Sequence, residues 1–438
     1  MTLTTPITVI RGRFLDIQKT VSQAAEIADQ VRYLEDGVLI TEQGKIRWFG
    51  TWNDAQDHLP ANVDIQHYPE QLIIPGMIDT HIHFPQTEMV GAYGEQLLSW
   101  LNTYTFPTEI QFKDKAYASE IAKFFVNELL KNGTTTALVF CTVHPESVNA
   151  LFEAAEQHQM RLIAGKVMMD RHAPEALCDT ADSSYDDSKA LIEKWHGQGR
   201  ALYAITPRFA PTSTPEQLER AGQLKAEHPD VYVHTHLSEN KDEIAWVKDL
   251  FPAQKGYLDV YHHYGLTGQR SVFAHCVHLE DAEWQYMHET DSAIAFCPTS
   301  NLFLGSGLFP LNKTWQQQVK VGLGTDVGAG TSFSLLQTVN EAYKVQQLQG
   351  DKLSAYESLY HATLGGAKAL DLDDKLGNFN VGKEADFVVL NLQPTALQQL
   401  RQSRAKSLED SLFALFTMGD DRNVEATYIY GQKAYSQN

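Results

Sequence analysis

Between about residues 71 and 370, the chain alternates short runs rich in β-branched and aromatic residues with longer runs of helical periodicity. Several short runs are apolar almost throughout, which is typical of parallel strands covered by helices. Eight strands are predicted in this way, at 72–83, 134–140, 162–169, 201–207, 231–237, 271–277, 292–297 and 319–325. Eight successive βα units predict a (β/α)8 TIM barrel, with a doubly wound α/β sheet as the alternative.

The intervening segments carry helix start and stop signals. The segment 214–217 reads Thr-Pro-Glu-Gln, which places a capping threonine before a proline at the first helical position. Ahead of the second strand, the apolar residues Ile121, Phe124, Phe125 and Leu129 recur at helical spacing. Gly133 follows and is expected to end this helix. The pattern therefore predicts helices between the strands.

The two ends of the chain have a different pattern, with short strand-like pieces separated by turns. Residues 1–70 contain such pieces at 7–10, 37–40 and 45–49, and residues 376–438 contain them at 385–390 and 426–429. Neither end has enough apolar surface to form a core by itself. We expect both ends together to form one small β-sandwich domain beside a barrel domain of residues 71–375.

Composition and charge narrow the class of protein. The chain has 438 residues, of which 43% are hydrophobic and 21% are charged, an ordinary globular balance. The net charge of −20 disfavours a nucleic-acid or membrane-surface partner, because both are anionic. The sequence shows neither an apolar run of about 20 residues nor a secretory signal, so we expect a cytoplasmic protein. Its four cysteines are too dispersed for a thiolate zinc site and are interpreted as buried reduced thiols.

Candidate metal ligands stand where the predicted strands end. His81 and His83 close the first strand, and alternate residues of a strand face the same way, which in a barrel is inward at the catalytic end. His236 closes the fifth strand, and Asp326 follows the eighth. Three imidazoles and a carboxylate form a donor set that suits Zn²⁺, with Fe²⁺ or Mn²⁺ as alternatives. His234, two residues deeper than His236, is expected inside the barrel.

Two further groups lie next to these strand ends. Glu239 follows His236 by three residues, where a carboxylate can reach a metal-coordinated water without binding the metal; the alternative is a solvated loop residue. His275 ends the sixth strand and either joins the ligands, hydrogen-bonds that water, or has a purely structural role. Dinucleotide-binding, Walker and His-Glu-x-x-His motifs do not occur in the sequence.

Longer motifs point to a known family. The segment 75–83 reads Pro-Gly-Met-Ile-Asp-Thr-His-Ile-His and resembles the Pro-Gly-x-x-Asp-x-His-x-His signature of the amidohydrolase superfamily. Within it, the sequence resembles the guanine deaminase family at 83–86, 91–94, 207–211, 235–240 and 324–326, and the wider deaminase group at 296–301 and 382–387. The resemblance covers essentially the whole chain.

The resemblance implies a zinc-dependent hydrolase that deaminates guanine to xanthine and ammonia. Binuclear members of the superfamily carry a bridging lysine at the end of the fourth strand, which here ends Ile-Thr-Pro-Arg at 205–208. One zinc ion per chain is therefore implied, with the ligands His81, His83, His236 and Asp326. The implied residues around the base are His83, Gln86, Arg208, Phe209, His236, Glu239 and Asp326.

The resemblance also implies catalytic roles. Asp326 or Glu239 takes a proton from the zinc-coordinated water, His275 lies beside that water, and Glu239 protonates N3 so that ammonia can leave. A homodimer is implied, and the stretch 85–108 is the candidate lid. One rival is a hydrolase of another ring, such as an adenosine derivative or a chlorotriazine, against which Gln86, Arg208 and Phe209 argue. The other is a non-enzymatic scaffold, which would have lost its metal ligands.

Overall fold

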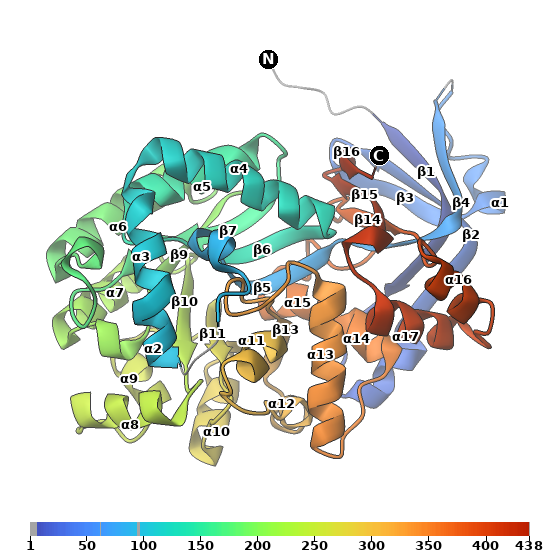
Figure 1. The fold of residues 1–438 in the computed structure, drawn as a ribbon. Helices are drawn as coiled ribbons and strands as arrows, with labels where there is room; N and C mark the ends of the chain where they lie inside the picture. Colours follow the sequence, from blue (N-terminus) through green and yellow to red (C-terminus); the bar gives the residue numbers. More distant parts are fainter. Residues whose placement is uncertain (1–6, 62, 94–96, 438) are drawn as a thin grey trace.

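A computed structural model describes residues 7–61, 63–93 and 97–437. Its larger part is a barrel of parallel strands surrounded by helices, and its smaller part is a mixed sheet in which the blue N-terminal strands lie beside the red C-terminal ones (Figure 1). The fold class predicted from the sequence is thus confirmed. None of the described helices is both long enough and apolar enough to cross a membrane.

The barrel strands follow one another around the ring in chain order, and each pairs in parallel with the next. They are β5 (Met77–His83), β6 (Thr134–Phe140), β7 (Arg161–Gly165), β9 (Leu202–Pro207), β10 (Tyr232–Leu237), β11 (Ser271–His275), β12 (Ala293–Phe296) and β13 (Lys320–Leu323), and the short β8 (Val167–Met168) also pairs with β9.

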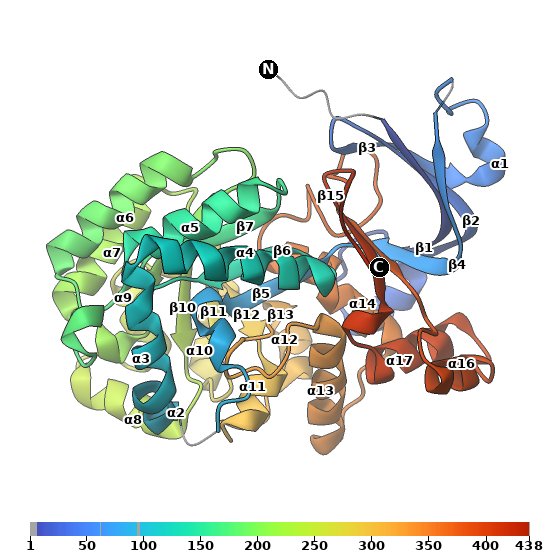
Figure 2. The same cartoon turned by 45° about the horizontal axis from the view of Figure 1, so that its top comes forward.

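Helices cover the outside of this barrel, as Figure 2 shows from a second direction. The main ones between the strands are α4 (Lys115–Lys131), α5 (Pro145–Glu156), α6 (Ala181–Trp195), α7 (Pro215–Glu227), α8 (Lys241–Leu250), α9 (Tyr257–His263), α10 (Asp281–Glu289), α11 (Pro298–Phe303) and α12 (Leu311–Gln317). The last strand is followed by α13 (Leu335–Leu348), α14 (Ala355–Ala362), α15 (Leu364–Ala369), α16 (Ala396–Gln402) and α17 (Leu408–Met418).

The small sheet is built from both ends of the chain. Its seven strands, in spatial order, are β16 (Gln432–Ser436), β15 (Val424–Ile429), β14 (Phe387–Leu390), β4 (Ile65–Pro75), β1 (Thr8–Ile17), β2 (Val31–Glu42) and β3 (Lys45–Thr51), with α1 (Trp52–Ala55) after β3. Buried ion pairs fix the late segment before β14 to the barrel: Glu384 binds Arg161 at 2.6 Å and Arg200 at 2.5 Å. These contacts explain the family-like motif at 382–387.

Two predicted strands are wrong in their extent. The run 72–83 forms two strands, because Pro75 ends β4 in the small sheet and Gly76 turns the chain into β5 of the barrel. A Cβ atom at Gly76 would lie 2.0 Å from Thr135 Oγ1, so only glycine permits this close crossing. Run 162–169 is likewise split into β7 and β8.

The helix predictions are confirmed with one correction. Thr214 caps α7, and its hydroxyl accepts a hydrogen bond from the Gln217 N–H at 3.2 Å. On α4, Ile121, Phe125 and Leu129 are buried, but Phe124 is 54% exposed. It lies outside the buried stripe because a residue adjacent to Phe125 is turned by about 100° around the helix axis.

The seam between the first and last barrel strands brings the candidate ligands together. Thr80 Oγ1 donates to the Leu323 carbonyl at 3.0 Å across this seam. Just beyond β13, the Asp326 N–H donates to the His81 carbonyl at 2.9 Å, and the His83 N–H donates to the Val327 carbonyl at 2.9 Å. The end of β5 and the loop after β13 are therefore held together at one rim of the barrel.

Candidate metal centre and substrate pocket

Four donor atoms from three parts of the barrel converge at this rim. His81 Nε2 lies 3.2 Å from His83 Nε2, and each of these atoms lies 3.2 Å from Asp326 Oδ1. His236 Nε2, at the end of β10, lies 3.3 Å from His83 Nε2. Metal ligands at 2.0–2.1 Å in tetrahedral geometry are separated by about 3.3 Å, so these spacings fit a four-coordinate zinc site.

The protonation states of the donors also fit a metal. Burial lowers the pKa of His83 to about 3 and lowers the pKa values of His81 and His236 as well, so the three rings are neutral and offer lone pairs. Burial by itself would raise the pKa of Asp326. The adjacent His81 and His83 outweigh that effect, and the pKa of Asp326 lies well below its ordinary value.

Hydrogen bonds at the far side of the rings orient two of the ligands. His236 Nδ1 donates to the Arg208 carbonyl at 2.7 Å, and His81 Nδ1 lies 2.8 Å from His234 Nε2. In both rings the Nδ1 atom is thereby engaged and Nε2 faces the common centre. His234 is completely buried inside the barrel, as predicted.

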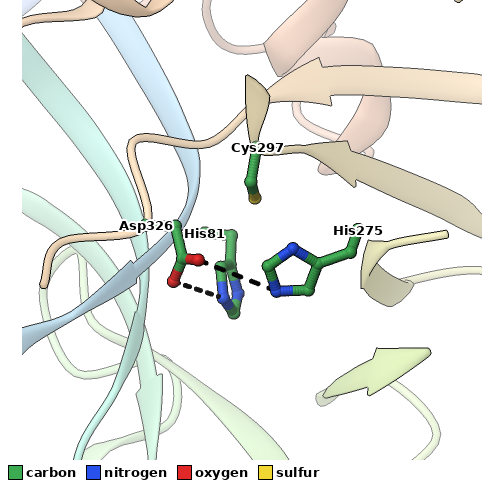
Figure 3. A group of neighbouring side chains, drawn as sticks. All are labelled: His81, His275, Cys297 and Asp326. Atoms are coloured by element: carbon green, nitrogen blue, oxygen red, sulfur yellow. Dashed lines mark ion pairs between the residues drawn. The ribbon is translucent and has the colours of Figure 1, made fainter. Parts of the chain in front are cut away.

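Figure 3 shows a second, overlapping group in which Cys297 lies near His81, His275 and Asp326. Burial raises the pKa of Cys297 well above its ordinary value, and its thiol lies 3.5 Å from the Ala295 carbonyl. A neutral thiol is a poor metal ligand, so the imidazole set is the better site. The predicted burial of all four cysteines is wrong for Cys178, which is partly exposed.

Glu239 and His275 lie beside the donor set. His275 Nε2 is 3.5 Å from Glu239 Oε2 and 3.7 Å from Asp326 Oδ2, and its Nδ1 lies 2.9 Å from Asn301 Oδ1. Glu239 is 3% exposed and accepts a hydrogen bond from Ser306 Oγ at 3.0 Å, so it is no solvated loop residue. Burial, reinforced by the charge of Asp326, raises the pKa of Glu239 to about 8.

The backbone at these strand ends adopts a sparsely populated conformation. Ser238, His275 and Asp326 all have positive φ angles, of 49°, 73° and 51°. Left-handed backbone at a residue other than glycine is costly and is concentrated at functional sites. Of these three residues, His275 and Asp326 line the pocket at the barrel mouth.

A pocket opens from the donor set toward the other predicted residues. Gln86, Arg208 and Phe209 line it together with His83, His236, His275, Glu239 and Asp326. Gln86 and Arg208 are 2% and 3% exposed. Every residue that the family resemblance implies around the base therefore lines one pocket, together with three of the four metal donors.

The sequence also matches a family model. The amidohydrolase family model covers residues 72–434, well over half of the chain. The chain is 62% identical over 429 residues to a guanine deaminase of Escherichia coli, covering 98% of both proteins. It belongs to the guanine deaminase family of the amidohydrolases.

Solved structures of the guanine deaminase family have the same fold. The E. coli guanine deaminase structure matches with a TM-score of 0.96 at 60% identity, covering 99% of this chain and 100% of that one. A guanine deaminase of C. acetobutylicum, solved with guanine bound in its active site, matches with a TM-score of 0.88 at 30% identity, covering 98% and 100%.

Several pocket residues of this family member could not be identified from the sequence. Trp100, Leu101, Glu243, Leu304 and Ala329 complete the lining. Their sequence context gives no signal, because apolar residues and a helical glutamate are common everywhere. Asn301, by contrast, stands in the deaminase-like motif 296–301, which could have identified it.

The predicted lid, 85–108, is largely helical where it is described. Its elements are η2 (Phe84–Met89), α2 (Leu97–Trp100), the π-helical η3 (Leu101–Thr105) and α3 (Phe106–Glu109). Gly94 of the family-like motif 91–94 lies outside the described residues. Trp100 and Leu101 place this segment against the pocket, and among the described residues the buried indole N–H of Trp100 has no hydrogen-bond partner.

Proposed function

We propose that the protein catalyses the zinc-dependent hydrolysis of guanine to xanthine and ammonia. The observation that carries this proposal is one pocket with a tetrahedral N/O donor set at one end and a purine-reading pair, Gln86 and Arg208, at the other. The family relatives named above carry the same activity in their names. His81, His83, His236 and Asp326 would hold one zinc ion per chain.

When bound, zinc lowers the pKa of a coordinated water and supplies a nucleophile at neutral pH. Water attack at C2 of guanine requires a group that removes a proton and one that delivers a proton to the ring. Burial favours the protonated form of Glu239, which suits a group that delivers a proton to N3. Asp326 is the alternative first acceptor, and His275, between the two carboxylates, orients the water. The second proton of the water passes to the 2-amino group, the bond between C2 and that amino nitrogen breaks, and ammonia leaves.

The opposite end of the pocket recognises the base. The Nη1 group of Arg208 is engaged with Glu109, and among the described residues the rest of the guanidinium has no hydrogen-bond partner. It can therefore donate to O6 of guanine. Gln86 retains one amide N–H for an acceptor on the ring, and Phe209 offers an apolar face.

A substrate panel with ammonia detection tests the activity. Guanine should release ammonia, while adenosine derivatives and chlorotriazines should not react, because they lack the O6 acceptor for Arg208. Metal analysis of the same preparation should give about one zinc per chain. Turnover of a triazine or an adenosine derivative without turnover of guanine would refute the proposed substrate, and full activity after exhaustive chelation would refute the role of zinc.

Three further expectations belong to this proposal. The family resemblance supports a cytoplasmic homodimer. Residues 71–375 and the joined segments 1–70 and 376–438 are proposed as two domains, although β4 of the small sheet continues to Pro75. Sedimentation of the purified protein and limited proteolysis test the dimer and the boundaries.

A further inference from the structure

Glu109 is a buried carboxylate that touches both proposed purine-reading side chains. It ends the short helix α3 in the segment that covers the pocket, and it is completely buried. Its Oε2 atom accepts a hydrogen bond from Arg208 Nη1 at 2.8 Å, and its Oε1 atom accepts one from Gln86 Nε2 at 3.2 Å. No motif or spacing in the sequence distinguishes this residue.

Both contacts use Glu109 as a hydrogen-bond acceptor. Arg208 is always a donor, and the amide nitrogen of Gln86 is a donor, so the group between them must accept twice. The charge of Glu109 has its only close cationic partner among the described residues in Arg208, at 2.8 Å. Arg208 is held from a second side by the ring of Phe106, on the same helix, 5.6 Å from its guanidinium carbon.

Gln86 is fixed in the same way. Its Oε1 atom accepts a hydrogen bond from the Gly328 N–H at 3.2 Å, while its Nε2 atom donates to Glu109. Turning the amide over would place two donors face to face at Gly328 and two acceptors face to face at Glu109. The carboxylate therefore fixes the orientation of the Gln86 amide. In this orientation the second N–H of Nε2 is the group that remains to donate to a ligand.

We propose that Glu109 is a positioning residue that sets the purine specificity of this pocket. One carboxylate holds Arg208 and Gln86, which follow different barrel strands, so that both present N–H groups to an oxo-purine. It also neutralises the charge of Arg208, which suits a neutral base. This inference rests on the proposed function, because it assigns Arg208 and Gln86 to recognition of guanine.

The test compares unreactive purines that differ in the oxo group at position 6 and in the N1 proton that accompanies it. Hypoxanthine has the O6 acceptor and purine lacks it, and neither carries the 2-amino group, so both serve as competitive inhibitors. Glu109→Gln keeps the shape but supplies a donor where two acceptors are needed. We expect its Ki for hypoxanthine to rise roughly 10–100-fold and its Ki for purine to change less than about threefold, the usual range for losing one hydrogen bond to a charged group. Guanine turnover should suffer mainly through KM.

A matched control lies elsewhere in the barrel. Asp179 is also a carboxylate held between a cation, Lys166, and an amide, Gln217 Nε2 at 2.8 Å, and it does not line the pocket. Asp179→Asn should lower the melting temperature without changing the ratio of the two Ki values. Glu109→Asp keeps the charge but shortens the side chain, so it should fold and give an intermediate ratio.

The outcomes separate the two ideas. Suppose that the wild-type enzyme deaminates guanine, but that Glu109→Gln only lowers the melting temperature and leaves the Ki ratio unchanged, as Asp179→Asn is expected to do. This result would overturn the positioning role of Glu109. Combining Glu109→Gln with Arg208→Met should leave the ratio of the Arg208→Met variant nearly unchanged, because the group to be positioned is gone. Failure of the wild-type protein to deaminate guanine would overturn the proposed function instead.

Discussion

Replacing Glu239 by glutamine separates proton transfer from every other property of the site. The substitution preserves the shape of the side chain and removes its ability to carry a proton. The amide can still accept the hydrogen bond that Ser306 Oγ donates to Oε1 at 3.0 Å. Because Glu239 is not one of the four converging donors, the variant should bind zinc and guanine as the wild type does.

The loss of turnover can be bounded. A positioned general acid–base group contributes about 10²–10⁴-fold, which corresponds to roughly 2.7–5.5 kcal/mol of transition-state stabilisation. His275, whose Nε2 lies 3.5 Å from Glu239 Oε2 and 3.7 Å from Asp326 Oδ2, remains in place together with Asp326. We therefore expect kcat to fall within that range while KM for guanine stays within a few-fold.

The same substitution should stabilise the metal-free protein. Burial raises the pKa of Glu239 from 4.5 to about 8, so the folded state binds a proton more tightly than the unfolded state. Its contribution to stability is full below about pH 4.5 and is lost as the pH rises toward 8. At pH 7 the raised pKa of Glu239 lowers the free energy of unfolding by about 3 kcal/mol, and a glutamine, which does not ionise, avoids this loss. The variant should be more stable than wild type at pH 7, and the difference should vanish near pH 4.5.

The assay combines steady-state kinetics, zinc content and chemical denaturation of the chelated proteins between pH 4.5 and 8. Glu243→Gln is a matched control, because this buried neighbour lines the same pocket but its carboxylate is occupied by Tyr257 OH at 2.7 Å and by backbone N–H groups. Near-normal turnover of Glu239→Gln, or an equal loss in Glu243→Gln, would refute the assignment of the proton shuttle. Loss of zinc in Glu239→Gln would show that the ligand set is misassigned.

Three further predictions concern the metal and the base. His81→Ala should lose zinc and activity together, which elemental analysis detects; zinc retained at one equivalent would contradict the ligand set. His234→Leu should weaken zinc binding about 10–100-fold in a chelator competition, because His81 loses the partner that orients it, whereas His234→Gln should rescue the affinity through its amide oxygen. Arg208→Met should raise the activation free energy that corresponds to kcat/KM for guanine by roughly 2–4 kcal/mol. It should thereby abolish most of the preference for guanine over 2-aminopurine. The substitution should also destabilise the fold by about 3–5 kcal/mol, because Glu109 loses its counter-charge. An unchanged preference for guanine over 2-aminopurine would refute the proposal that Arg208 recognises O6.

Much of the site followed from local pattern alone. Strand periodicity fixes which side chains face inward, and the barrel rule fixes which strand ends carry function. His81, His83, His236 and Asp326 could therefore be placed together without knowing any tertiary contact, although the chain separates the first from the last by most of the barrel. The eight strands were found for the same reason, since each is a short apolar run between helical segments.

Tertiary structure decided the partners across the chain. The Arg208–Glu109 pair joins residues 99 positions apart, and nothing near Glu109 in the sequence distinguishes it from a solvated helical carboxylate. Whether a glutamate is paired depends on which elements pack together, and periodicity does not encode this. The split of the run 72–83 has a similar cause, because both halves are apolar and only the crossing of Gly76 over Thr135 sends them into different sheets. The sequence by itself determined which residues face the centre of the barrel, and the packing of distant elements determined what each of them touches there.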